Sequence, residues 1–322
     1  MAFGFRLALA GAAIVFGIST ASAQSYPNKN VTVVCGFAAG GGGDLICRYI
    51  AEKLGALAGQ RAIVENKVGA LGAIAAKATA HARPDGYTML VTAGSSASHA
   101  AHNVQFIKPL YDPIRDFILV TTLTRISFIV VVDPKKLPVT SMQELTAWAK
   151  GRKTTTGGST TTAQVASETY RLMSGIDMFQ VPYKSAQTTI IDLLGGELDF
   201  VFCDPGLAMS RMQSGAIRGL AVTSAARSAA NPNLPTMAES GFPGYDVSGW
   251  WAVFLPAGTP APIVAQLRKW VDEIVLRDET RQFFATSGID MFPAGDLDLQ
   301  KFMLAETEKW KKHYATAKIP PQ

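Results

Sequence analysis

The sequence predicts an α/β fold built as two lobes, each around a mostly parallel, doubly wound sheet. Runs of β-branched residues alternate with apolar-periodic, helix-like segments, and this alternation is typical of such sheets. A chain of 322 residues can bury a large core and favours two domains over one. Two such lobes pack naturally with a cleft between them, and ligands bind where the parallel strands end.

In the first half of the chain, strand and helix signals follow one another in order. The turn cluster Arg83–Gly86 ends a helix, and Pro134 stops a strand. Ser141 and Glu144 have the spacing of a capping box, which marks the start of a helix. The expected strands are Val31–Cys35, Ala62–Glu65, Tyr87–Thr92, Phe117–Thr124 and Phe128–Val132, and the expected helices are Leu45–Leu57, Gly72–Ala82 and Ser141–Ala149.

The second half repeats the alternation and closes with helices. A loop rich in proline and asparagine, Ser228–Pro235, separates its last two strands. The expected strands are Lys153–Thr156, Asp199–Phe202, Ile217–Thr223 and Trp250–Leu255. The expected helices are Ala163–Ser174, Thr188–Gly195, Gly206–Ser214, Ala261–Leu276, Glu279–Ser287 and Leu297–Ala317.

The first 23 residues have the pattern of a secretory signal peptide. Arg6 is their only charge, Leu7–Ile18 is apolar, and Ala21-Ser-Ala23 gives the small-x-small cleavage pattern. The apolar run is too short to span a bilayer. We therefore expect an exported protein that is cleaved after Ala23; the alternative is a buried N-terminal helix.

Composition argues against several classes of protein. The net charge of +5 is mildly basic and no dense Lys/Arg run occurs, so we expect no nucleic-acid partner. The odd number of cysteines (Cys35, Cys47 and Cys203) leaves at least one thiol free or intermolecular. We expect all three to be packing residues, although whether any of them pair stays open. The four histidines form no zinc-binding pattern, and we expect neither a metal site nor a cofactor.

A glycine loop is the most informative local feature. The run Val31–Cys35 meets the four glycines of Gly40–Gly43, and Asp44 then precedes a helical segment. Such a junction directs unpaired backbone N–H groups and a positive dipole end at one point, so it suits an anion. As the helix N-cap, Asp44 would repel a ligand carboxylate. Either it turns inward to cap, or the ligand carries an amine or a proton there.

Two further loops, Ala93–Ser98 and Gly157–Thr162, share this design. Each follows a strand, precedes a helix and is rich in small or hydroxyl residues, which admit a ligand close to the backbone and add donors. An ordinary βα turn would explain any one loop, but three together favour a binding site. Lys184 and Asp204 end strands of the second lobe, where a side chain would face the cleft.

Nucleotide and catalytic motifs are missing from the sequence. The glycine loop fits neither the Walker pattern nor Gly-x-Gly-x-x-Gly, and no Gly-x-Ser-x-Gly elbow exists. His99 beside Ser95 is poor evidence for a Ser/His pair, because such partners usually meet from distant segments. We therefore expect no catalytic residue.

The chain resembles the Bug/TctC family, the periplasmic solute-binding proteins of tripartite tricarboxylate transporters. Each similar segment is weak alone, but together they cover almost the whole chain after the leader. They are Tyr26-Pro27, Gly36–Asp44, Val64–Asn66, Gly69–Gly72, Pro84–Thr88, Tyr111–Pro113, Arg115–Phe117, Val181–Lys184, Asp192–Gly196, Leu220–Ser224 and Leu255–Ile263.

The resemblance implies a two-lobed Venus-flytrap fold of the type II periplasmic binding class. Lobe 1 would comprise residues 24–122 and 250–322, and lobe 2 residues 123–249. The family binds di- and tricarboxylates, aromatic acids or acidic amino acids, mainly through loop backbone and hydroxyl groups. The implied ligand-binding residues are Gly40, Gly41, Gly42, Gly43, Asp44, Ser95, Ser96, Ser98, His99, Ser159, Thr160, Thr161, Thr162, Lys184 and Asp204.

Several positions depart from the family's usual pattern. The usual Pro-Phe-Pro-Pro-Gly-Gly-Gly-Thr-Asp is here Gly36–Asp44, which lacks the prolines and the threonine hydroxyl of that pattern. Cys203 stands where an aspartate is usual, Ser185 replaces a glycine, and Gln164 replaces a histidine. These changes bear on which carboxylate binds, not on its class.

Together these features predict a monomeric, non-enzymatic periplasmic receptor that closes on a small carboxylate and delivers it to the membrane subunits of a tripartite tricarboxylate transporter. A second possibility is a sensor that presents its liganded form to a signalling receptor. A third, a cleft hydrolase, would need a nucleophile–base pair that the sequence does not offer.

Overall fold

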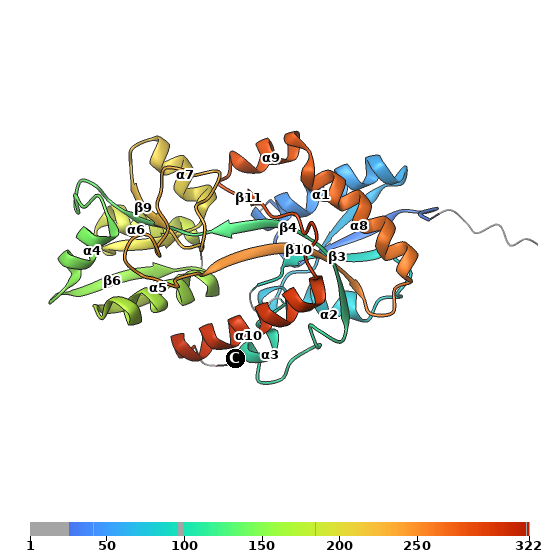
Figure 1. The fold of residues 1–322 in the computed structure, drawn as a ribbon, viewed down its shortest axis with the longest axis horizontal. Coiled ribbons are helices and arrows are strands. Elements are labelled where there is room, and N and C mark those ends of the chain that lie inside the picture. The colour runs from blue at the N-terminus through green and yellow to red at the C-terminus, as the bar shows by residue number, and fades with distance from the viewer. Residues whose placement is uncertain (1–25, 41, 96–98, 184, 320, 322) are drawn as a thin grey trace, which may run out of the picture.

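The computed structural model describes residues 26–40, 42–95, 99–183, 185–319 and 321. Two sheets, each with helices packed against it, form two lobes along the long axis of the molecule (Figure 1). The predicted two-lobed α/β fold is therefore confirmed. The expected leader, residues 1–23, lies outside the described residues.

Sheet A, in lobe 1, has six strands and a mixed arrangement. Its order is β11 (Asp290–Met291), β4 (Phe117–Ser127), β10 (Ser248–Pro256), β3 (Thr88–Ala93), β1 (Val31–Cys35) and β2 (Ala62–Asn66). Strands β2, β1 and β3 are parallel, whereas β10 is antiparallel to both β3 and β4. The parallel half carries the glycine loop, because that loop follows β1.

Sheet B, in lobe 2, has five strands. Its order is β7 (Asp177–Pro182), β6 (Lys153–Gly158), β8 (Phe200–Cys203), β5 (Ile129–Val132) and β9 (Arg218–Val222). Strands β7, β6 and β8 are parallel, and β5 pairs antiparallel with β8 and β9. Both sheets are thus parallel on one side and antiparallel where the chain passes between the lobes.

Two neighbouring strands connect the lobes. Phe128 alone separates β4 of sheet A from β5 of sheet B, and β10 brings the chain back beside β4 (Figure 1). The chain therefore passes from sheet A to sheet B between Ser127 and Ile129, and it returns to sheet A between Val222 and Ser248. The division of the lobes at residues 122 and 249 stays a prediction.

The helices cover the faces of the two sheets. Those of lobe 1 are α1 (Gly42–Ala58), α2 (Ala73–Ala80), α3 (His102–Gln105), α8 (Ala261–Leu276), α9 (Asp278–Ala285) and α10 (Leu299–Ala317). Those of lobe 2 are α4 (Met142–Ala149), α5 (Thr161–Ser174), α6 (Ala186–Gly195) and α7 (Pro205–Gln213). The Ser141 hydroxyl accepts the Glu144 N–H at 3.2 Å, which confirms the predicted cap of α4.

One predicted helix is shorter than expected. The segment Gly72–Ala82 was expected to be helical throughout, but α2 begins at Ala73, and the 3₁₀ turn η1 (Ala70–Gly72) precedes it. Gly69 and Gly72 have φ values of 131° and 90°. This backbone departs from the right-handed helix, and glycine adopts it without a steric penalty.

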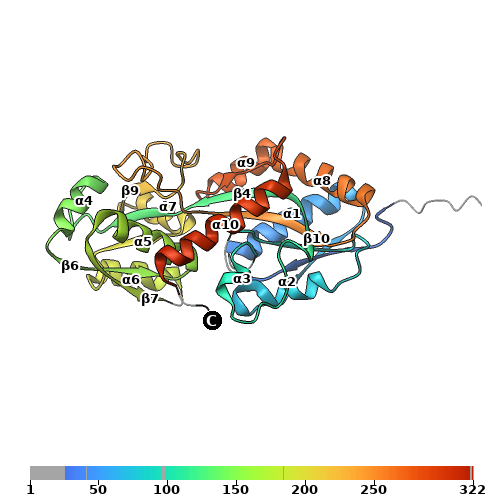
Figure 2. The same cartoon turned by 60° about the horizontal axis from the view of Figure 1, so that its bottom comes forward.

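The C-terminal helix α10 packs against both lobes (Figure 2). It contacts α5 in lobe 2, and β4 and α3 in lobe 1. Trp310 is fully buried in a core cluster that includes residues of both lobes. Near the interlobe strands, Glu306 accepts the Trp250 indole N–H at 2.7 Å, and Lys309 pairs with Asp246 at 2.6 Å. Within the described part of the chain, no helix is long and apolar enough to cross a bilayer.

Candidate ligand-binding site

Strand pairing brings the expected loops together in two pairs, one in each lobe. In sheet A, Cys35 of β1 lies beside Val91 of parallel β3, so the loops that follow these strands share one edge. In sheet B, Gly157 of β6 lies beside Val201 of parallel β8. The loop Ser159–Thr162 and Asp204 therefore also share an edge. Ligands of open α/β sheets bind at such edges.

Asp44 organises the glycine loop from within. Its carboxylate is only 2% exposed and accepts the Gly40 N–H at 2.8 Å, the Arg48 Nε–H at 2.7 Å and the Asn66 amide N–H at 2.8 Å. Because α1 begins at Gly42, Asp44 lies in the first helical turn and not at the expected N-cap position. The inward orientation left open by the sequence is the one observed.

The environment of Asp44 keeps it ionised. Burial alone would raise the pKa of this carboxyl group, but the hydrogen bonds from Arg48, Asn66 and Gly40 together lower the pKa from 3.8 to about 2. The Arg48 guanidinium also balances its charge. Asn66, which ends β2, is a member of this cluster that the sequence reasoning did not assign.

The glycines of the loop differ in the space around them. A Cβ added to Gly43 would lie 2.6 Å from the Phe37 ring and 2.8 Å from the Trp251 ring, so two aromatic side chains cover this position. A Cβ added to Gly42 would meet nothing within 4 Å, and Gly40 is similarly open but has a φ of +79°. Gly40 and Gly42 are exposed, so their backbone is accessible to a ligand.

The described ends of the second loop are buried. Ser95 is 1% exposed, and its hydroxyl accepts the Trp250 backbone N–H at 3.2 Å. His99 is fully buried. The centroid of its ring lies 3.8 Å from that of Phe254 and 4.9 Å from that of Phe117. Burial and the neighbouring His102 lower the pKa of His99 to about 3, so it is neutral. We expected His99 to contact the ligand, but here its side chain is enclosed in the core.

The tryptophans of β10 also have structural positions. Trp250 and Trp251 are 3% and 5% exposed. Trp251 packs against Phe37 with 4.9 Å between ring centroids, and Trp250 packs against Phe302 at the same separation. Both tryptophan rings are therefore packing residues of the core.

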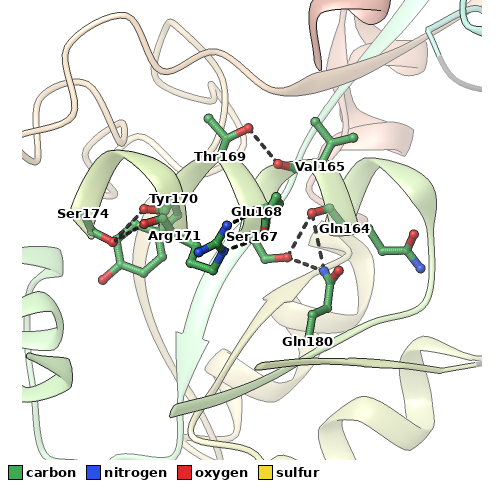
Figure 3. Close-up of polar contacts among 9 residues, drawn as sticks. All are labelled: Gln164, Val165, Ser167, Glu168, Thr169, Tyr170, Arg171, Ser174 and Gln180. Atoms are coloured by element: carbon green, nitrogen blue, oxygen red, sulfur yellow. Dashed lines mark hydrogen bonds and ion pairs between the residues drawn. The ribbon is translucent and has the colours of Figure 1, made fainter. Parts of the chain in front are cut away.

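In lobe 2, Thr160 caps the helix that follows the third loop. Its hydroxyl accepts the Ala163 N–H at 3.2 Å, and α5 begins at Thr161, two residues earlier than expected. Gln180 of β7 donates to the Gln164 carbonyl at 3.4 Å and also contacts the Ser167 hydroxyl, which ties the start of α5 to sheet B (Figure 3). Ser159, Thr160 and Thr161 remain partly or fully exposed.

Asp204 caps α7 where the lobes touch. Its carboxylate accepts the Gly206 N–H at 3.0 Å, and burial raises the pKa of its carboxyl group. A Cβ added to Gly206 would lie 3.4 Å from the Ser287 carbonyl oxygen of lobe 1. Nearby, Asp290 of β11 accepts the Ala230 N–H at 3.0 Å. The loop edge of lobe 2 is therefore held against lobe 1 at this point.

Some of the expected site residues lie outside the described part of the chain: Gly41, Ser96, Ser98 and Lys184. Among the residues described, no group of three or more His, Cys, Asp or Glu side chains could hold a metal ion. Cys35, Cys47 and Cys203 are buried free thiols.

Known proteins are similar to this chain in fold and in sequence. Residues 46–317 match the family model described as the tripartite tricarboxylate transporter family receptor, TctC. BugT of Bordetella pertussis is 29% identical over 311 residues, which cover 95% of this chain and 93% of that protein. The structure of R. palustris Rpa4515 with adipate has a TM-score of 0.80 and 32% identity, covering 92% of this chain and all of that one. MatC from Rhodopseudomonas palustris with bound malate has a TM-score of 0.74 and 26% identity, and the match covers 89% of this chain and 99% of that one.

The two-lobed fold, with small-residue loops at the carboxyl ends of parallel strands, is that of a periplasmic solute-binding protein. The chain belongs to the TctC family of tripartite tricarboxylate transporter receptors. The resemblance noted from the sequence is thereby confirmed.

Proposed function

We propose that this chain is a periplasmic receptor that binds a small dicarboxylate between its lobes and delivers it to the membrane subunits of a tripartite tricarboxylate transporter. The observation that carries the proposal is the pairing of β1 with β3 and of β6 with β8, which gathers the small-residue loops at one edge of each sheet. Related receptors solved with adipate and with malate support a dicarboxylate. Residues 1–23 would direct export and would be removed by cleavage after Ala23.

The proposed binding groups are backbone and hydroxyl groups of the exposed loop residues. The helices α1 and α5 begin at Gly42 and Thr161, and the N–H groups of a first turn have no acceptor within the helix. Two helix N-termini suit the two ends of a dicarboxylate. Ser159 and Thr160 would add hydroxyl contacts. Asp44 would hold the glycine loop in shape, since both of its oxygens already accept hydrogen bonds.

Closure of the lobes would accompany binding. A ligand can shift the lobes toward a closed arrangement only if it binds that arrangement more tightly. The strands β4 and β10, which pass between the sheets, are where such a rotation would take place.

Thermal unfolding with a ligand panel tests the class of ligand. The chain from Gln24 onward is heated with adipate, malate, citrate, benzoate, glutamate and sodium chloride. A ligand at about 100 times its dissociation constant stabilises the folded state by roughly 2.7 kcal/mol, and we expect a dicarboxylate to do so. If no carboxylate raises the unfolding midpoint, the proposal fails; turnover of a bound compound would favour a hydrolase.

A pair of valine substitutions tests the place of binding. Gly42→Val adds a side chain where the structure has open space, so we expect normal stability but a loss of at least tenfold in affinity for the best dicarboxylate. Gly195→Val makes the same change at the exposed end of α6, also in open space, and serves as the matched control. Equal affinity in both variants would remove the glycine loop from the site.

A further inference from the structure

A pocket of about 420 Å³ lies in lobe 1 between β4, β10, α8 and the start of α10. Its size falls within the range of small-molecule sites. The side chains Phe117, Phe254 and Met303 are 7%, 0% and 5% exposed and form its floor. Leu299 and other aliphatic side chains form the walls. The accessible lining is apolar at Ile118, Leu119 and Leu299 and polar at Arg268 and Gln300, so the pocket offers both kinds of surface to a ligand.

The floor of the pocket and the glycine loop lie against opposite faces of sheet A. Side chains alternate between the two faces of a strand, and Phe254 belongs to a different core cluster from Trp251, which lies three residues earlier on β10. Trp251 covers Gly43, whereas Phe254 lines the pocket. A ligand in the pocket would therefore be separate from a ligand at the candidate site.

Arg268 of α8 is the only charged residue in the described lining of the pocket. Its guanidinium is held in place by a hydrogen bond from Nη2 to the Gly295 carbonyl at 3.0 Å and by Asp272 at 3.4 Å. Asp272 is itself fixed by the Thr121 hydroxyl at 2.5 Å. Among the described residues, Arg268 Nη1 has no hydrogen-bond acceptor. An oriented guanidinium with a free donor beside an apolar pocket suits an anionic head group.

We propose that this pocket is a second binding site, which takes an amphipathic monoanion: one carboxylate or sulfonate head on Arg268 and an apolar body along Ile118, Leu119 and Leu299. Such a molecule differs from a dicarboxylate, because its second end needs no polar partner. The binding of one ligand at the pocket does not depend on the candidate site between the lobes.

Isothermal titration calorimetry with octanoate tests the proposal by measuring its affinity and its stoichiometry. We expect one octanoate to bind the chain from Gln24 onward. Arg268→Gln should weaken binding at least tenfold, which corresponds to about 1.4 kcal/mol. Lys269→Gln removes the same charge from the next, exposed position of α8 outside the lining, and should change the affinity less than twofold. Gly42→Val should leave octanoate binding unchanged.

Uncharged octan-1-ol separates the head group from the body. We expect it to bind the parent chain and Arg268→Gln equally. The proposal is overturned if octanoate does not bind at millimolar concentration, if both charge variants behave alike, or if Arg268→Gln also loses octan-1-ol. Loss of octanoate in Gly42→Val would place it between the lobes and would equally overturn the second site.

Discussion

Replacing Asp44 by asparagine should destabilise the fold in a way that depends on pH. The two carboxylate oxygens accept three hydrogen bonds, from Gly40, Arg48 and Asn66. Asparagine keeps the shape but supplies one acceptor oxygen and an NH2 group. Whichever way the amide turns, its NH2 group faces a donor, and the ion pair with Arg48 is lost.

The magnitude follows from the shifted ionisation. The pKa of Asp44 falls from 3.8 to about 2 on folding. Such a difference corresponds to at most about 2.4 kcal/mol of stability above pH 5. Because the Arg48 side chain is 54% exposed and its charge is screened by solvent, we expect about 1–2 kcal/mol. Because the pKa of Asp44 is lower in the folded state, its ionised carboxylate stabilises the folded state above pH 3.8. This stabilisation is lost as the pH falls toward 2.

Urea unfolding at pH 7, 5, 3.5 and 2.5 measures this contribution. The free energy of unfolding of Asp44→Asn should lie about 1–2 kcal/mol below that of the parent at pH 7 and 5, and the gap should narrow at pH 3.5 and fall to about a third at pH 2.5. Asp278→Asn, at an 83% exposed position in the first turn of α9, is the control and should change little. A gap that stays constant with pH, or one no larger than that of the control, would refute the reasoning.

Two further substitutions test the packing of the glycine loop and the cap of α4. Gly43→Val should lower stability by about 1–3 kcal/mol in urea, because its side chain meets the Phe37 and Trp251 rings, whereas Gly42→Val should not; equal stabilities would contradict the packing described for Gly43. Ser141→Ala should cost about 1 kcal/mol, because it removes the acceptor of the Glu144 N–H. Ser210→Ala on α7 should stay within about 0.5 kcal/mol, and a Ser141 effect no greater than that would show that the cap contributes little to α4.

The order of strands and helices could be predicted from the sequence because it depends on local patterns. The hydrophobic periods and the Ser141 cap act within one element. Local patterns alone do not mark the passage between the lobes, which was placed near residues 122 and 249 only by the family resemblance, since β4 and β5 form an almost unbroken run of residues suited to either sheet. Which strands pair is decided by contacts between segments that are distant in the sequence.

The candidate site was predictable as loops but not as side-chain positions. The serines around His99 suggested an exposed loop, yet the aromatic rings that enclose the histidine come from β4 and β10. Likewise Asp44 was ambiguous, because its partner Asn66 ends β2, and only the parallel pairing of β1 with β2 brings the two together. Such neighbours are set by tertiary packing and leave no local trace in the sequence.

The position of β10 between β3 and β4 determines when lobe 1 can form during synthesis. The ribosome releases β1 to β4 before the whole of lobe 2, yet β3 and β4 do not pair with each other and need β10 between them. Sheet A thus stays divided, with β4 unpaired, until residues 248–256 emerge. Lobe 2 is complete in sequence by then and can fold first. An unpaired strand such as β4 is prone to aggregate. Chains that have emerged beyond β4 but not yet as far as β10 are therefore the ones that most need a chaperone.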